Sequence, residues 1–370
     1  MGVEAAFEGR DPFEERGGWP AVLGQLLRGE SLSEDDAELV LSQVLAGSAT
    51  PAQTAAFMVA LRAKGESVVE MTGLVRAMMA RAEPLSIDGL VVDVVGTGGD
   101  RLRSINVSTL AACIVAGAGV PVCKHGNRAA SSSVGTADVL EALGVAVELG
   151  SAGVARCVAE AGMGFCFSQR FHPAMRHVAA VRRELGIPTV FNFLGPLANP
   201  ARVRHQLVGV SDPEMAPRMA GVLGANGSLR AMVVYADDGL DELSVTSPST
   251  VLDLVGDGSG QWEVRTWRLD PGDLGFPRAV MGDLRGGDAE FNAGAIRRVL
   301  GGERSPRRDI GVLNAAAALV VAGRAEDLAG GVAMASESID QGRAEAVLDR
   351  LVAISKEEAA SQGGPVAAGP

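Results

Sequence analysis

A run of glycines directly after an apolar segment is the first feature of the sequence that could bind an anion. Residues 91–95 (VVDVV) lead into Gly96, Thr97, Gly98, Gly99 and Asp100. Glycine lets backbone N–H groups approach an anion closely and adopts positive φ angles without strain. The segment matches neither the dinucleotide-binding pattern GxGxxG nor the P-loop, which ends in Gly-Lys-Ser/Thr. Taken alone, it fits a phosphate cradle and an ordinary tight strand–helix turn equally well.

The segment NVST supplies an amide and two hydroxyls where we expect a helix to begin, at about Ser108. Asn106, Ser108 and Thr109 could bind a phosphate or a metal ion, and the helix dipole would favour an anion there. An ordinary helix N-cap uses the same residue types and is the more frequent reason for such a pattern.

A dense polar cluster follows the apolar run GVPVC. It contains Lys124, His125 and Asn127, and then serines that include Ser131 and Ser132. Ligands bind open α/β sheets at the carboxyl ends of the strands, and cations and hydroxyls in that place suit a pyrophosphate. A solvated loop is the alternative, but so dense a cluster rarely follows a buried strand without a use.

Two adjacent carboxylates, Asp241 and Glu242, follow another apolar run, AMVVY. Mg²⁺ prefers such hard oxygen ligands beside substrate phosphates, although a charged turn is the more frequent reason for an isolated acidic pair. Arg182, in VRRELG, could bind a substrate carboxylate or lie at the surface. Pro196, in FNFLGPLANP, could belong to the wall of a pocket. The sequence carries no zinc-like spacing of His, Cys and Asp, and no nucleophile motif.

Composition limits the classes of protein to which the chain can belong. A length of 370 residues suits two domains or one large one, and 47% hydrophobic residues allow a large core. The formal net charge of −12 lacks the basic footprint of nucleic-acid binders, so we expect no nucleic-acid partner. No uncharged apolar run reaches the roughly 18 residues of a membrane span, so we expect no membrane partner. The four cysteines show no CxxC spacing and predict buried free thiols, and we expect a cytoplasmic protein.

Helix start and stop signals dominate the stretch from Trp19 to about residue 85. Ser33, Thr50 and Ser67 are typical N-caps, and the last two are followed at the third position by Gln and Glu, as in a capping box. Glycines stand at 47 and 65, where helices would end. This part of the chain predicts a bundle of about four short helices.

Short β-branched runs alternate with Ala-rich stretches after residue 90. The segments 90–95, 119–126, 144–150, 230–235 and 249–255 are the predicted strands, and 261–280 reads as strand and loop. This alternation predicts a mostly parallel α/β sheet. A helical stretch at 173–186 interrupts it, and residues 292–354 return to helix.

The ordered set GTGGD, NVST, KHGNRAASS, HPAM, VRRELG, FNFLGPLANP and DGLDELS resembles the anthranilate phosphoribosyltransferase family, which belongs to the class III, nucleoside-phosphorylase-like phosphoribosyltransferases. The likeness extends from about residue 20 to 355. It implies an α/β fold with a small N-terminal helical domain at 19–88, joined by about 172–200, and a large, mostly parallel sheet domain at 89–171 and 201–356. Residues 1–18 and 357–370 would be loose tails.

The resemblance also implies an activity, namely transfer of the phosphoribosyl group of 5-phosphoribosyl 1-pyrophosphate (PRPP) to the amine of anthranilate in tryptophan biosynthesis. The glycine loop from Gly96 to Asp100 would hold the donor together with Asn106, Ser108, Thr109, Lys124, Ser131 and Ser132. Two Mg²⁺ ions would be bound by Ser108, Asp241 and Glu242. Anthranilate would meet Gly96, His125, Asn127, Arg182 and Pro196, and Lys124, Asn127 and Arg182 would be the catalytic residues. Members of this family usually form homodimers through the small domains.

Departures from the family pattern lie near the acceptor side and leave other activities open. Ser168 and Gln169 stand where Ala-Pro is frequent, Val134 where a small polar residue is common, and Pro188 where Arg is frequent. One alternative is a pyrimidine nucleoside phosphorylase of the same fold, which would need no Mg²⁺. A second is a phosphoribosyltransferase for another aromatic amine, and a third is a non-catalytic nucleotide- or nucleic-acid-binding homologue.

Overall fold

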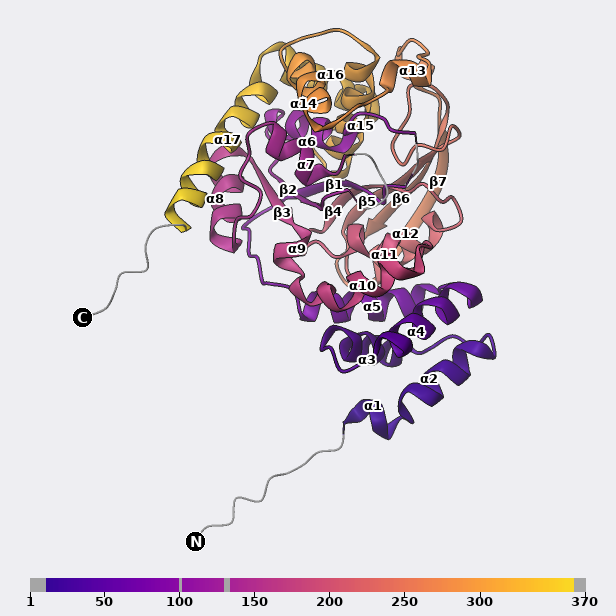
Figure 1. Cartoon of the computed structure of the whole chain (residues 1–370). Helices are drawn as coiled ribbons and strands as arrows, with labels where there is room; N and C mark the ends of the chain where they lie inside the picture. Colours follow the sequence, from indigo (N-terminus) through magenta and orange to yellow (C-terminus); the bar gives the residue numbers. More distant parts are fainter. Residues whose placement is uncertain (1–10, 100–101, 130–133, 363–370) are drawn as a thin grey trace, which may run out of the picture. The chain divides into compact units, whose positions relative to one another are not determined.

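The computed structural model describes residues 11–99, 102–129 and 134–362, and the chain divides into two compact units (Figure 1). The helical unit comprises Met1–Arg81 and Ala174–Leu194, and the α/β unit comprises Ala82–Pro173 and Gly195–Pro370. The expected domains were 19–88 with about 172–200, and 89–171 with 201–356, so the structural division falls within seven residues of each expected internal boundary.

Local capping signals define the helices of the helical unit, which are α1 (Pro12–Glu15), α2 (Gly18–Leu27), α3 (Glu34–Leu45), α4 (Pro51–Lys64), α5 (Val68–Ala80), α10 (Arg176–Leu185) and α11 (Phe191–Leu194). The Ser33 side chain accepts from the Asp36 N–H at the start of α3. Thr50 and Ser67 each form a complete capping box, with Gln53 and Glu70. The predicted helix starts of α3, α4 and α5 are therefore confirmed.

The chain ends are more ordered than the expected tails over the residues that the structure describes. Phe13 in α1 is buried, and its ring meets that of Trp19 edge-on at a centroid distance of 5.4 Å. The last helix, α17 (Arg343–Gln362), continues past residue 356. One buried aromatic ring is enough to fix α1 against α2, and a single short helix gives little signal in a sequence.

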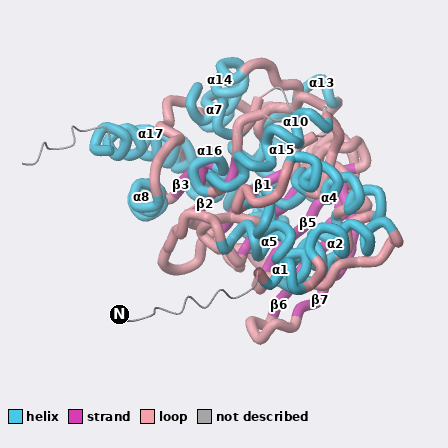
Figure 2. Tube along the Cα trace, turned by 60° about the horizontal axis from the view of Figure 1, so that its bottom comes forward, coloured by secondary structure: helices cyan, strands magenta, loops and turns pink. Residues whose placement is uncertain are grey.

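The α/β unit is built on one seven-stranded sheet with the order β3-β2-β1-β4-β5-β6-β7. The strands are β1 (Val92–Gly96), β2 (Val122–Gly126), β3 (Met163–Phe167), β4 (His205–Gly209), β5 (Arg230–Ala236), β6 (Ser249–Gly256) and β7 (Trp262–Leu269). Neighbours from β3 to β5 pair in parallel, whereas β6 and β7 continue the sheet antiparallel as far as the edge opposite β3 (Figure 2).

Helices cover both faces of this sheet. Helices α6 and α15 pack on the central strands, α12 packs on β5 and β6, and α17 packs on α8 and β3. Figure 1 shows α6, α14, α15 and α16 on one side of the sheet and α12 on the other. The helices of this unit are α6 (Val107–Gly117), α7 (Thr136–Ala142), α8 (Ser151–Ala161), α9 (Ser168–Phe171), α12 (Ala216–Ala225), α13 (Met281–Leu284), α14 (Ala289–Leu300), α15 (Pro306–Val321), α16 (Leu328–Asp340) and α17, with the 3₁₀ turns η1 (Pro173–Met175), η2 (Gly195–Leu197) and η3 (Pro271–Leu274).

Most predicted strands are confirmed, but one is wrong and two were missed. The segment 144–150 forms no strand: its Val145, Val147 and Leu149 are buried, but the Ala146 N–H donates to Ser355 Oγ on α17 at 3.0 Å and not to a neighbouring strand. Strands β3 and β4 were not predicted. Their sequences, MGFCF and HQLVG, are only five residues long and lack a continuous β-branched run.

The strand order changes direction between β1 and β4. The strands β2 and β3 are added on one side of β1, and β4 to β7 are added on its other side. Loops at the carboxyl ends of the strands diverge at such a switch point, which leaves a crevice for ligands. Over the described residues, the predicted polar segments at 97–99, 127–129 and 238–244 follow β1, β2 and β5 at this edge. Within the described part of the chain, no helix is both long enough and apolar enough to cross a membrane.

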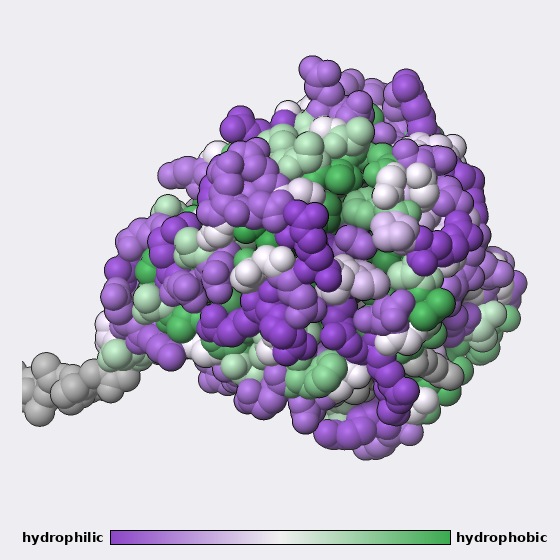
Figure 3. Space-filling view, turned by 90° about the horizontal axis from the view of Figure 1, so that it is seen from above, coloured by the Kyte–Doolittle hydropathy of each residue, from purple (hydrophilic) through white to green (hydrophobic). Residues whose placement is uncertain are grey.

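The surface seen from above α13, α14 and α16 is mostly hydrophilic, with smaller apolar areas between the polar side chains (Figure 3). This matches a chain in which 21% of the residues are charged.

Candidate active site

A cavity of about 240 Å³ opens at the carboxyl ends of the central strands of the α/β unit. The structure brings together most of the predicted site residues of this unit there. The predicted residues that line it are Gly96, Thr97, Gly98, Gly99, Asn106, Ser108, Lys124, His125, Asn127, Asp241 and Glu242. The glycine-loop backbone, the Lys124 ammonium group and the carboxylates of Asp241 and Glu242 therefore all face one small cavity.

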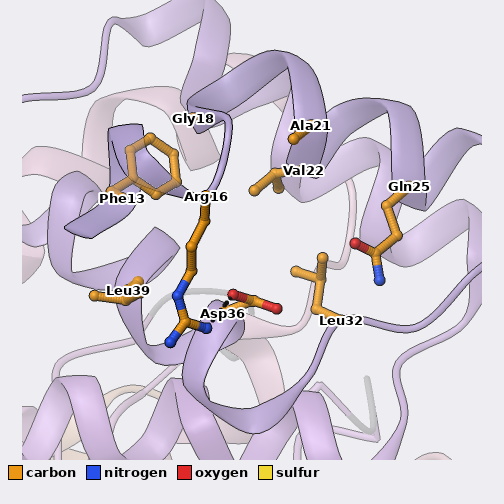
Figure 4. A pocket seen from close by; sticks show the side chains of 9 residues that line it. All are labelled: Phe13, Arg16, Gly18, Ala21, Val22, Gln25, Leu32, Asp36 and Leu39. Atoms are coloured by element: carbon orange, nitrogen blue, oxygen red, sulfur yellow. Dashed lines mark hydrogen bonds and ion pairs between the residues drawn. The ribbon is translucent and has the colours of Figure 1, made fainter. Parts of the chain in front are cut away.

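Two larger cavities hold none of the predicted site residues. One, of about 370 Å³, lies in the helical unit, where Arg16 and Asp36 form an ion pair beside the apolar Phe13, Val22 and Leu32 (Figure 4). The other, of about 400 Å³, lies where β4 and β5 begin, at the opposite end of the sheet. Volume alone therefore does not identify the site, and we assign it from its convergent polar groups.

The glycine loop and the acidic loop (residues 238–244, which include Asp241 and Glu242) approach each other closely at the site. A Cβ atom on Gly209 would lie 1.5 Å from the Asp241 backbone oxygen, and one on Gly96 would lie 2.4 Å from Asp241 Oδ2. Gly98 adopts a φ of 66°, and its N–H donates to Asp241 Oδ2 at 2.6 Å. Only glycine fits at position 209, because the end of β4 packs directly against the backbone of the loop that carries Asp241, whereas a methyl group at position 96 would push the Asp241 carboxylate aside.

Both acidic side chains at the predicted metal site are buried at the cavity. Asp241 and Glu242 are 8% and 7% exposed. Asn314 on α15 fixes the loop, since its Oδ1 accepts from the Leu243 N–H at 3.0 Å and its Nδ2 donates to the Leu243 carbonyl at 2.8 Å. Among the described residues, no group of three or more His, Cys, Asp or Glu side chains could hold a metal ion. Two carboxylates with the Ser108 hydroxyl still fit Mg²⁺, which takes one or two carboxylates and completes its shell with water and substrate phosphates.

Lys124 crosses the interior to reach the start of α6. Its side chain is fully buried, and its Nζ donates to Ser108 Oγ at 3.0 Å and to the Val94 carbonyl. Burial lowers the pKa of Lys124, whereas the carboxylates of Asp93, Glu242 and Asp241 raise it. A buried ammonium group at the wall of the cavity interacts strongly with an anionic ligand, because little water screens the charges.

His125 is held in its neutral form. Burial, together with the neighbouring His172 ring at 5.3 Å, lowers the pKa of His125 to about 3. Its Nδ1 lies 3.1 Å from the Gly195 carbonyl oxygen. Pro196 follows Gly195 in η2, and its carbonyl accepts from Gln206 Nε2 at 3.1 Å. The Pro196 segment thus lies beside His125, although Pro196 is not among the residues that line the cavity.

Asn127 stands at the end of β2 and is oriented by its neighbours. Its Oδ1 accepts from the Arg128 N–H at 2.8 Å and from Gln169 Nε2 at 3.2 Å. Arg128 itself turns to Asp138 and Glu141 and is not available as a phosphate ligand in this arrangement. The contact with Gln169 connects one of the departures from the family pattern to a predicted acceptor residue.

Two further predicted residues that the structure describes, Thr109 and Arg182, are not among those that line the cavity. Thr109 is buried inside α6, away from the lining of the cavity. Arg182 is on α10 in the helical unit, where its guanidinium lies 5.9 Å from the Phe191 ring centroid and burial lowers its pKa. Asp100, Ser131 and Ser132 fall outside the described residues.

Two buried residues behind the cavity were missed from the sequence. Asp93 and Asn199 are 0% and 4% exposed, and Asn199 Nδ2 donates to Asp93 Oδ2 at 2.8 Å. Burial raises the pKa of Asp93 to about 6, against the opposing effects of Lys124 and Asn199. The available signal was a lone carboxylate inside the apolar run VVDVV, because a buried acid is rare without a partner.

Comparison with known proteins agrees with this geometry. Residues 88–345 match the α/β domain of a glycosyl transferase family, and residues 20–82 match its helical bundle domain. An anthranilate phosphoribosyltransferase from Nocardioides sp. is 52% identical over 340 residues, covering 90% of this chain and 98% of the relative. The relative from Thermomicrobium roseum is also 52% identical, over 90% of this chain and 96% of its own length.

Solved structures show the same likeness. The anthranilate phosphoribosyltransferase from Thermus thermophilus superposes with a TM-score of 0.84 at 42% identity, covering 90% of this chain and 99% of that one. The enzyme from Saccharomyces cerevisiae in complex with PRPP and Mg gives a TM-score of 0.83 at 26% identity, covering 92% and 98%. On these matches, together with the cavity at the switch point, the chain belongs to the anthranilate phosphoribosyltransferase family.

Proposed function

We propose that this protein transfers the phosphoribosyl group of PRPP to the amine of anthranilate, giving N-(5-phosphoribosyl)anthranilate and pyrophosphate in tryptophan biosynthesis. The observation that carries the proposal is the meeting of a buried lysine, a glycine loop and two buried carboxylates in one cavity at the switch point of the sheet. A metal-bound pyrophosphate needs these groups together. Relatives of this chain were solved with PRPP and Mg and with 4-fluoroanthranilate.

The site would act mainly through charge and position. Pyrophosphate leaves C1 of the ribose while the amine attacks from the opposite side, so negative charge grows on the leaving oxygen. Lys124, the Ser108 hydroxyl and backbone N–H groups of the glycine loop stabilise that charge. The amine of an aniline attacks without prior deprotonation, so no strong base is required. His125 stays neutral at the pH of the cell, since its pKa is about 3.

Magnesium use follows from the same residues. Ser108, Asp241 and Glu242 would hold the metal, and we propose two ions for each active site. Bound Mg²⁺ neutralises the phosphate charges of the donor and of the departing pyrophosphate. A pyrimidine nucleoside phosphorylase of this fold would not need the paired acids at 241 and 242.

The remaining substrate contacts are proposals from the family pattern. The donor would contact the glycine loop from Gly96 to Asp100, with Asn106, Ser108, Thr109, Lys124, Ser131 and Ser132. Anthranilate would contact Gly96, His125, Asn127, Arg182 and Pro196, with the Arg182 guanidinium near the acceptor carboxylate. Lys124, Asn127 and Arg182 are the proposed catalytic residues.

We further propose a homodimer that works in the cytoplasm. The dimer rests on the usual assembly of this family. The four cysteines are free and buried, which suits a reducing compartment.

Acceptor profiling tests the activity. The purified protein, with PRPP and Mg²⁺, is assayed against anthranilate, 3-aminobenzoate and 4-aminobenzoate, and separately against thymidine with phosphate and no metal. We expect turnover with anthranilate alone. Preference for another aminobenzoate would assign the protein to a different aromatic amine, and metal-free phosphorolysis of thymidine would assign it to the phosphorylases.

A further inference from the structure

The ladder between β1 and β2 has a single register pair, at the start of both strands. β1 pairs with β4 along its whole length, from Val92 to Gly96, and β2 pairs with β3 along its whole length. Between β1 and β2, by contrast, the only register pair is Val92 with Val122. Beyond that pair, a regular parallel ladder would join the Val94 N–H to the Cys123 carbonyl and the His125 N–H to the Val94 carbonyl.

Side chains take over each of these interrupted backbone groups. The His125 N–H donates to Asp93 Oδ1 at 3.2 Å, and Asn199 Nδ2 donates to the Cys123 carbonyl at 2.9 Å. The Val94 carbonyl accepts from Lys124 Nζ, and the Val94 N–H stabilises the Asp93 carboxylate. Each of these four backbone groups therefore has a side-chain partner.

This arrangement buries more polar and charged groups than a continuous ladder would. A regular ladder would satisfy the same backbone groups without burying a carboxylate, an amide and an ammonium group. Taking a carboxylate and an ammonium group out of water costs free energy even when they are paired, a cost that neutral backbone hydrogen bonds do not carry. The interruption also lies directly beneath the cavity, at the residues that precede and include Lys124 and His125. A stability cost concentrated at one point of a site indicates a functional requirement there.

We propose that Asp93 and Asn199 are positioning residues that separate β1 from β2 and so place the Lys124 ammonium group at the donor's phosphates. The proposal rests on the proposed function, because it assigns Lys124 to PRPP. Asn199 connects the two strands, since the same amide nitrogen donates to Asp93 on β1 and to the Cys123 carbonyl on β2. Its own Oδ1 is fixed by the Ala201 N–H at 2.9 Å.

A double-mutant cycle tests whether Asn199 acts through Lys124. The dissociation constant of PRPP with Mg²⁺ is measured by calorimetry for wild type, Asn199→Ala, Lys124→Met and the double variant. We expect Asn199→Ala to weaken PRPP binding about tenfold in the wild-type background, which corresponds to about 1.4 kcal/mol. In the Lys124→Met background we expect less than a twofold effect, since the group being positioned is gone.

A control variant separates positioning from simple destabilisation. Ser338→Ala removes another buried hydrogen bond of the α/β unit, from Ser338 Oγ on α16 to the Ile114 carbonyl in the second half of α6 at 2.8 Å, and neither residue lines the cavity. It should lower the melting temperature without changing PRPP binding. If Asn199→Ala does not fold, Asp93→Asn takes its place in the cycle, because an asparagine cannot accept all the hydrogen bonds of the carboxylate.

Each outcome bears on a different claim. Equal effects of Asn199→Ala in both backgrounds, or unchanged PRPP binding by the folded variant, would overturn the positioning role while leaving the proposed function intact. A folded wild type that binds no PRPP in the presence of Mg²⁺ would contradict the proposed function itself and, with it, the role given to Lys124.

Discussion

Burial controls the ionisation of single residues at the site. Asp93, Lys124 and His125 are all buried, and burial moves the pKa of each toward the neutral form. Only Lys124 has nearby carboxylates that oppose this effect from the cavity side. The site therefore keeps a buried Lys124 cation balanced by nearby carboxylates, which suits the binding of a metal-bound polyanion.

The neutral state of His125 makes a testable prediction about acid stability. Its folded-state pKa of about 3 lies below the value near 6.5 of an unfolded histidine. As the pH falls below about 6.5, the unfolded chain takes up a proton that the folded protein does not. The free energy of unfolding then decreases by up to about 1.4 kcal/mol per pH unit. Wild type should lose about 2 kcal/mol more than His125→Gln between about pH 7 and 5 in urea unfolding.

The comparison with His125→Gln isolates this one group. Asp93 has a raised pKa and contributes with the opposite sign as the pH falls from about 6 to 4, but both proteins carry it. An identical pH dependence of unfolding in the two proteins would mean that His125 is not held neutral by the fold.

The assignment of Arg182 to the acceptor predicts a selective kinetic effect. Arg182→Ala should raise the KM for anthranilate about tenfold or more, because a charge-assisted contact with a carboxylate is lost, and leave the KM for PRPP within about twofold. The neighbouring Arg183, which is exposed, provides the matched variant Arg183→Ala with little expected change. Steady-state kinetics with each substrate varied in turn would decide, and a rise in the PRPP KM alone would reassign Arg182 to the donor.

At the scale of elements, two strand ends and one loop make the metal site possible. β1 and β4 end in Gly96 and Gly209, which are paired in register, and the Asp241 loop packs on both. A methyl group at position 209 would collide with the Asp241 backbone, and one at position 96 would meet the Asp241 carboxylate.

Gly209→Ala should therefore displace the acidic loop and raise the Mg²⁺ concentration required for half-maximal activity, at least fivefold by our order-of-magnitude expectation for a disturbed ligand shell. Gly282→Ala is the matched control, since a Cβ there meets nothing within 4 Å. A magnesium titration of activity, with circular dichroism to verify folding, measures the effect. An unchanged titration for folded Gly209→Ala would show that the close approach is not needed for the metal.

Sequence reasoning succeeded at this scale where the signals are local. Ser33, Thr50 and Ser67 cap helices through contacts within three residues, so a short stretch of sequence is sufficient to find them. It failed at 144–150, where alternating apolar residues pack against α17 from more than two hundred positions away. β4 was missed because its neighbours, β1 and β5, supply the pairing that its own sequence does not suggest.

The residues of the candidate site also fall into those that the sequence could predict and those that it could not. The glycine loop, the Lys124 segment and the acidic pair could be predicted because their residue types are unusual at the end of apolar runs. Asp93 and Asn199 could not, because their importance lies in a pairing across 106 positions that replaces a sheet ladder. Thr109 is buried on α6 and does not line the cavity, so its contact with the donor stays a prediction.

At the scale of the whole molecule, the chain matches its relatives nearly end to end. About 90% of it aligns with relatives that are themselves covered by 96–98%. Both the helical bundle and the α/β domain of the family are present. The central claim is accordingly about chemistry at the α/β cavity, namely a magnesium-dependent transfer that depends on the acidic loop.

Loss of anthranilate fluorescence in the presence of PRPP, followed across a Mg²⁺ titration, tests that claim most directly. The proteins compared are wild type, Asp241→Ala and the matched variant Asp237→Ala, whose carboxylate pairs with Arg268 at the surface. The account predicts Mg²⁺-dependent turnover by wild type and Asp237→Ala, and a loss of about a hundredfold or more in Asp241→Ala. Full turnover by Asp241→Ala, or equal turnover without any divalent metal, would contradict it.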